Sequence, residues 1–223
     1  MTLWNTRTEA ILYLEKDCPA KLSVLLDLFG AIDILIDCYE QNSEKNTYAR
    51  ICGLTLLKAK NLGIGSFSLI LDGLGQEAGA LLRPFIEYTE LITYFRHFPD
   101  KVEDVSNDKL PSAGARAEAI NGIYKKFREH LNLYASHSSY SDYTLSHLLE
   151  PNNFRFKKYQ PNVPAVLDRN LRDISMQILL LLFEATRALE RLNLKEFDEL
   201  ADRADKLNEK LFQEFELDTL EAK

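Results

Sequence analysis

The stretch VLDRNLRDISMQILLLLFEATRALERLNL, residues 166–194, decides the fold class of this chain. Its apolar residues recur every three or four positions, which is the spacing of one face of an α-helix. Within it, the run from Ile178 to Phe183 is apolar throughout and indicates a helix with packed neighbours on all sides. That run is far shorter than the roughly 20 residues needed to cross a bilayer. We therefore expect a buried helix over 166–194, ending near Asn193.

The same spacing recurs along most of the rest of the chain. It predicts further helices over residues 19–41, 43–61, 66–97 and 114–136. Asn61, Gly63 and Gly65 are expected to end the second of these. Residues 195–223 form a charged helix with a narrow apolar seam, a pattern typical of coiled coils.

These patterns predict an all-α fold. We expect a bundle of about six or seven helices with an up-and-down-like core, forming one domain over residues 1–223. Its charged C-terminal helix, residues 195–223, could pack on the bundle or act as an oligomerisation arm of a homodimer.

Composition limits the classes of protein to which the chain can belong. With 34 acidic and 27 basic residues, the net charge of −7 gives no general attraction to nucleic acid or anionic lipid. The three cysteines form no C-x-x-C pair, which argues against a disulfide framework and a thiolate metal site. No apolar run is long enough to span a membrane. We expect a cytoplasmic protein with no membrane association.

A polar stripe crosses the apolar helix predicted over 66–97. Its residues follow one another at steps of three or four, so they share one helix face: Asp72, Gln76, Gly79, Arg83, Glu87, Glu90 and Tyr94. Arg83 and Glu87 have the i,i+4 spacing of a direct ion pair. Two interpretations stay open, since the face can be solvated, or it can point inward and line a polar pocket.

One histidine lies in a setting suited to chemistry. His137 follows Ser136 where a helix is expected to end, and further hydroxyl residues come directly after it. An imidazole among hydroxyls can act as a general base, although a buried histidine satisfied by its neighbours has the same pattern. Basic residues are interspersed with aromatic ones around 124–128 and 154–159. This pattern is found in proteins that bind single-stranded nucleic acid, and it is also found where long basic side chains cover the edge of a core and keep their charges in water.

Two motifs resemble those of a group of bacterial all-helical proteins that are known only as domains of unknown function. The motifs are Arg83-Pro84-Phe85-Ile86-Glu87 and Tyr134-Ala135-Ser136-His137, and the likeness covers roughly residues 45–150. Such proteins are distantly similar to HEPN-type ribonucleases, which implies RNA cleavage. The arginine-to-histidine spacing of the HEPN motif is not matched by Arg128 and His137, which are separated by eight residues.

Three functional hypotheses follow, and no cofactor or metal can be named from the sequence. The first is a binding or regulatory module whose pocket uses Asp72, Gln76, Glu90, Tyr94 and Ser136. The second is a HEPN-like effector that cleaves RNA, with Arg83, Glu87 and His137 converging as catalytic residues and RNA or a nucleotide as ligand. The third is a magnesium-dependent all-α nucleotide pyrophosphohydrolase that uses Glu87 and Glu90, with a second pair at Glu199 and Asp202.

Overall fold

The computed structural model describes residues 3–122, 124–131, 145, 148–150, 155–157 and 162–217. The long helices are α1 (Leu3–Asp17), α2 (Pro19–Gln41), α3 (Thr47–Leu71), α4 (Gly75–His97), α9 (Pro164–Leu189) and α10 (Phe197–Glu214). Short helices are α5 (Glu103–Ser106), α6 (Ala113–Ala119) and α7 (Lys125–Leu131), with 3-10 turns η1 (Pro99–Val102) and η3 (Glu190–Leu192). The all-α prediction is confirmed. The described ranges hold nine α-helices, so the expected six or seven are not confirmed.

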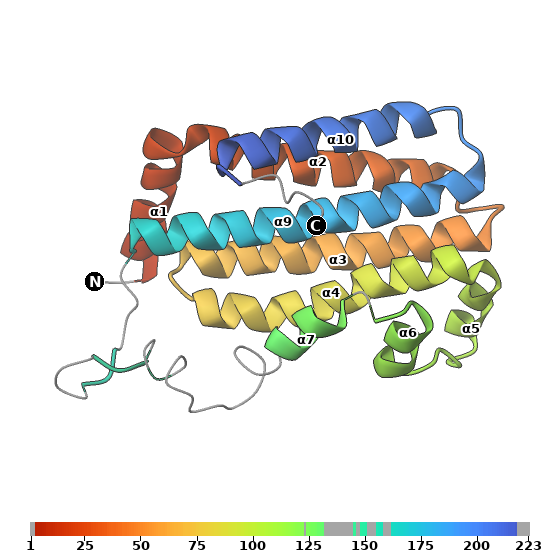
Figure 1. Ribbon diagram of the computed structural model, residues 1–223, viewed down its shortest axis with the longest axis horizontal. Coiled ribbons are helices and arrows are strands. Elements are labelled where there is room, and N and C mark those ends of the chain that lie inside the picture. Colours follow the sequence, from red (N-terminus) through yellow and green to blue (C-terminus); the bar gives the residue numbers. More distant parts are fainter. Residues whose placement is uncertain are drawn as a thin grey trace.

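The long helices are stacked around α9, which lies in the middle of the bundle (Figure 1). It packs against α2 and α10 on one side and against α3 and α4 on the other, while α1 crosses one end. The chain runs in one direction in α2, α4 and α9 and in the opposite direction in α3 and α10 (Figure 1). The core-facing positions of α9 follow the predicted stripe, with Leu171, Ile174, Ile178 and Leu181 fully buried.

The helix end predicted at residues 61–65 is wrong, because α3 continues to Leu71. Gly63 lies where α3 meets three other helices. A Cβ atom there would come within 2.7 Å of Cδ1 of Ile178 on α9 and 3.4 Å of an aromatic ring on each of α2 and α4. The glycine therefore permits a close approach of helices instead of ending one.

The helix predicted over 66–97 is the end of α3 followed by the whole of α4, separated by a sharp turn. Gly73 has φ of 77°, in the left-handed region that favours glycine. The N–H of Leu74 donates to the carbonyl of Leu69 over 2.9 Å, which closes the Schellman motif common at helix ends. A stripe extrapolated across this turn therefore mixes residues of two helices.

Two other segments also differ from the sequence prediction. The helix α1 was not predicted, although Ala10 and Leu14 bury their side chains in the core. The helix expected over 114–136 is interrupted at Asn121 and Gly122, whose φ angles of 61° and 63° are incompatible with a continuing helix. The result is a pair of short helices, α6 and α7, that both contact α4.

The apolar seam of α10 faces its own chain. Leu200, Ala204, Leu207 and Leu211 are buried, and α10 contacts α2 and α9. The ion pair of Lys210 with Asp27 on α2, 2.7 Å long, holds the same face. Since a single copy covers the seam, it is not free to serve as a dimer contact, and the homodimer stays a prediction.

By length and composition alone, α3 is the one helix in the described ranges that could cross a membrane. The core helix of a soluble bundle passes the same test, and 33% of its most apolar window is buried here. The long helices α2, α4 and α9 pack against it, with α1 and η1 making smaller contacts.

Close packing at Gly53 of α3 yields a test of the fold. A Cβ at this position would lie 2.9 Å from Cβ of Tyr39, an atom fixed to its own backbone, whereas a Cβ at Gly30 of α2 would meet nothing within 4 Å. We expect Gly53→Ala to lower the free energy of unfolding by about 1–3 kcal/mol through overpacking. We expect Gly30→Ala to raise it by up to about 1 kcal/mol through helix propensity. Urea unfolding measures both, and equal effects of the two substitutions would contradict this packing.

Candidate ligand site beside α4

Of the predicted stripe, Asp72 does not belong to the α4 face. It ends α3, and its carboxylate accepts two hydrogen bonds from Arg7 of α1, at 2.7 Å from Nε and 2.6 Å from Nη2. Arg7 Nη2 also donates to the hydroxyl and the carbonyl oxygen of Ser68, at 2.7 and 3.1 Å. This bidentate pair fixes α1 to the end of α3. The prediction that Asp72 shares one helix face with Arg83 and Glu87 is therefore wrong, and its role in binding stays a prediction.

The remaining stripe on α4 passes from half-exposed to fully buried along the helix. Gln76 and Arg83 are half-exposed, whereas Glu90 and Tyr94 are 1% and 5% exposed. Arg83 and Glu87 form the expected ion pair, with Nε and Oε1 3.5 Å apart. The part of the stripe that is C-terminal to Arg83 thus points inward, toward α6 and α7.

Glu90 is a buried carboxylate with an incomplete set of partners. Its Oε1 lies 3.0 Å from Nε of Arg128 on α7, an ion pair without hydrogen-bond geometry. Neither oxygen of Glu90 has a hydrogen-bond partner among the described residues. Burial raises the pKa of Glu90 to about 7; Arg128 and Arg116 lower it, and Glu87 raises it. A carboxyl that titrates near neutral pH and is incompletely satisfied is typical of functional sites.

A second arginine reaches the same face from α6. Arg116 donates from Nη1 to the carbonyl of Pro111 over 2.6 Å, while its buried Nε has no hydrogen-bond partner among the described residues. Burial lowers the pKa of Arg116, and the charges of Glu87 and Glu90 oppose that shift. The helices α4, α6 and α7 thus place arginine side chains around the carboxylates of Glu87 and Glu90.

A hollow of about 450 Å³ opens beside this cluster, between α3 and α4. We call it the α3–α4 hollow. Its walls are mainly apolar, with three charged side chains among them. They are formed by Ile51, Leu54, Thr55 and Lys58 of α3, Pro84, Glu87, Tyr88 and Leu91 of α4, Val105 of α5, Leu110, and Arg116 of α6. The volume lies within the roughly 300–1,000 Å³ of small-molecule sites.

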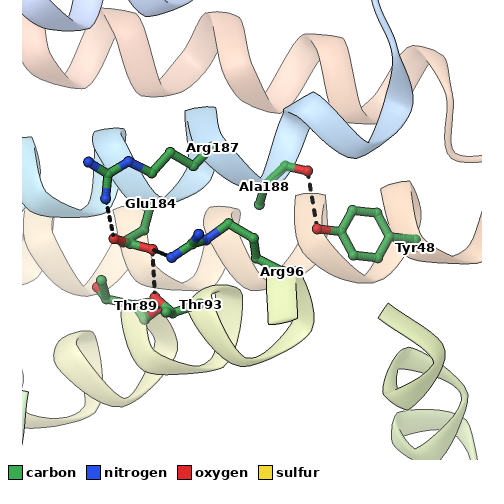
Figure 2. A network of polar contacts seen from close by, with 7 residues as sticks. All are labelled: Tyr48, Thr89, Thr93, Arg96, Glu184, Arg187 and Ala188. Atoms are coloured by element: carbon green, nitrogen blue, oxygen red, sulfur yellow. Dashed lines mark hydrogen bonds and ion pairs between the residues drawn. The ribbon is translucent and has the colours of Figure 1, made fainter. Parts of the chain in front are cut away.

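The opposite face of α4 carries a polar network that the sequence prediction missed. Figure 2 shows Glu184 of α9 between two arginines and a threonine. Its carboxylate lies 3.1 Å from Nη2 of Arg96, 3.3 Å from Nη1 of Arg187 and 3.0 Å from Oγ1 of Thr93. A signal was present, since Glu184 directly follows the most apolar run of the chain. A charged residue that continues the core-facing spacing of a helix is expected to be buried, and a buried charge needs a partner of opposite charge or a hydrogen bond.

A polar hollow of about 410 Å³ borders this network at one end of the bundle. It is lined by Arg96, His97, Arg187, Glu190, Arg191 and Asn193. These residues lie at the C-terminal ends of α4 and α9, which run in the same direction (Figure 1). Arginines at this place offset the negative ends of two parallel helix dipoles, so a role in stability is sufficient to explain their presence.

The remaining predicted site residues lie on α10 or outside the described residues. Ser136 and His137 lie outside the described residues. Glu199 and Asp202 are on α10, separated from α4 by α9 (Figure 1), and Asp202 pairs with Lys206. Among the described side chains, no three of His, Cys, Asp or Glu gather as metal ligands would.

Fold and site together define an all-α protein with a half-enclosed, mixed-charge hollow beside α4. No protein-family model, curated protein or solved structure matches the chain.

Proposed function

We propose that this protein is a binding or regulatory module whose ligand occupies the α3–α4 hollow. The observation that carries the proposal is the placement of Lys58, Glu87 and Arg116 in the wall of a mainly apolar hollow of about 450 Å³. Sites for small molecules combine apolar walls with a few convergent polar groups in this way. Glu90, next to them, adds a buried group able to gain or lose a proton near neutral pH.

The cluster also costs stability, which supports a functional role. Burying a carboxylate with no hydrogen bond, and arginine Nε groups likewise, is unfavourable compared with apolar packing of the same volume. A purely structural role would not require such groups at the edge of a hollow. Polar groups retained against stability are more often found at sites of recognition or chemistry.

An uncharged fluorescent probe, N-phenyl-1-naphthylamine, tests the site without presuming the charge of the ligand. We expect the dye to bind saturably at one site per chain and to become fluorescent in apolar surroundings. Leu54→Trp fills the hollow from its rim and is expected to weaken binding at least about tenfold, since overfilling costs roughly 1–3 kcal/mol. Leu57→Trp, on the same helix but outside the lining, is the matched control. Equal dye binding by both variants would rule out the hollow as the site.

An effector that cleaves RNA is the alternative that one observation favours. Arg83, Arg116 and Arg128 come from three helices to the face that carries Glu87 and Glu90, and cations of this kind can steady a phosphate. Cleavage of RNA by the purified chain, lost in His137→Ala without loss of folding, would replace the binding module with this alternative.

The homodimer and the cytoplasmic location also remain proposals. The net charge of −7 and the three free cysteines, Cys18, Cys38 and Cys52, are the observations in favour of a reducing, soluble setting.

A further inference from the structure

We infer that the ligand of the α3–α4 hollow is an amphipathic monocarboxylate, a single carboxylate on a medium-length alkyl chain. The inference rests on the proposed function and names the class of ligand. It depends on two features of the hollow, its long apolar walls and one incompletely satisfied guanidinium among them.

The walls favour an alkyl chain over a polar ligand. Seven of the residues that line the hollow are aliphatic, proline or aromatic, and they come from α3, α4, α5 and the connection before α6. Leu54 is 53% exposed at the rim, which leaves apolar area for a ligand to cover. Each CH₂ buried in such a place strengthens binding about fourfold.

Arg116 is the group suited to the carboxylate. A guanidinium has five N–H donors in a planar fork that matches the two oxygens of a carboxylate. One nitrogen of Arg116, Nη1, donates to Pro111. Its Nε is buried and has no hydrogen-bond partner among the described residues, so Arg116 lines the hollow with its other atoms, and the outer nitrogens of the fork are the donors for a ligand. Its neighbour Glu87 is engaged by Arg83, so Glu87 competes only in part for Arg116.

The balance of charge around the hollow favours one negative charge on the ligand. Lys58 and Arg116 are the cations in its wall, and Glu87 is the anion. Lys58 lies over the ring of Tyr88, with Nζ 5.8 Å from the centroid, and keeps a positive charge at the rim. A monoanion is therefore complementary, whereas a dianion such as a phosphate monoester would meet Glu87 with excess charge.

Displacement of N-phenyl-1-naphthylamine by decanoate, octanoate, 1-decanol and decylamine tests the ligand class. We expect decanoate to bind at least about tenfold more tightly than 1-decanol, because its charge adds a charge-assisted hydrogen bond. We expect octanoate to bind roughly 15-fold more weakly than decanoate, since it lacks two CH₂ groups. Decylamine is expected to be the weakest of the ten-carbon ligands, because its cation would face Lys58 and Arg116.

Arg116→Gln is expected to abolish the preference for decanoate over 1-decanol while the dye still binds. Arg172→Gln removes an exposed arginine of α9 outside the hollow and should leave all affinities unchanged. If the dye binds the hollow but decanoate and 1-decanol displace it equally, or if Arg116→Gln keeps the preference, the ligand class is wrong and the proposed function stands. If Leu54→Trp, folded by circular dichroism, binds the dye as the wild type does, the proposed function itself fails.

Discussion

Glu184→Ala is expected to lower the free energy of unfolding by about 3–5 kcal/mol, the typical cost of removing one partner from a buried ion pair. The side chain of Glu184 is 5% exposed and forms an ion pair with Arg96, which joins α9 to α4. Without it, the partly buried guanidinium of Arg96 loses its carboxylate, and a cavity remains between the two helices. Denaturation in urea at neutral pH measures the loss.

Arg187→Ala separates the buried part of this network from its exposed part. Arg187 pairs with the same carboxylate, but its side chain is 60% exposed, so its loss is expected to cost less than about 1 kcal/mol. If Glu184→Ala were as mild as Arg187→Ala, the carboxylate would not be the link between α4 and α9 that Figure 2 shows.

The second large effect concerns the pH dependence of stability. Burial raises the pKa of Glu90 from 4.5 to about 7 in the folded chain. Between these values the folded state keeps a proton that the unfolded state has lost, so stability falls as pH rises. The loss is complete above the folded-state pKa and amounts to about 3 kcal/mol, at 1.36 kcal/mol per pKa unit. Below pH 4.5 both states are protonated, and Glu90 contributes nothing to the pH dependence.

Glu90→Gln removes this titration, so the wild type is expected to lose about 3 kcal/mol relative to the variant between pH 4.5 and pH 8. Chemical unfolding across that range gives the difference directly. Glu129→Gln, which removes an exposed carboxyl from α7, is the matched control. A difference between wild type and Glu90→Gln that stays constant from pH 4.5 to pH 8 would show that Glu90 is not held in a desolvated place.

The sequence was sufficient where local periodicity alone decides the structure. The start of α2 at Pro19 and the chain turn at Asn193 after α9 follow from capping chemistry and apolar spacing. The apolar seam of α10 also follows from the spacing of its apolar residues, but this spacing does not determine whether the seam packs on its own chain or on another. That choice depends on what α2 and α9 leave uncovered.

The failures come from interactions between residues far apart in the chain. Gly63 was expected to end a helix because a glycine near a polar residue usually does, yet its role is set by Ile178, more than 100 positions later. Asp72 fits the polar stripe by spacing alone, because the three- to four-residue spacing of polar residues continues across the turn between α3 and α4. The left-handed Gly73 is the residue that makes this turn possible. The contact of Gly63 with Ile178 and the ion pair of Asp72 with Arg7 join residues far apart in the chain, so the spacing of nearby residues does not reveal them.

The candidate site was predicted in part for the same reason. Glu87, Glu90 and Tyr94 share the face that spacing gives them, and two of them are buried. Their partners Arg116 and Arg128 come from short helices whose positions depend on packing against α4. The sequence does indicate that Glu184 is buried, because this charged residue stands in the register of the apolar stripe of α9.

Arginine side-chain NMR tests the central claim, that the inward polar face of α4 borders a ligand site, most directly. The Nε–H resonance of Arg116 is recorded during titration with decanoate, beside those of Arg172 and Arg191 as internal references. We predict a saturable shift of the Arg116 resonance, with the other two unchanged, because Arg116 alone of the three lines the α3–α4 hollow. A shift at Arg191 with none at Arg116 would place the carboxylate at the other end of the bundle and contradict the assignment.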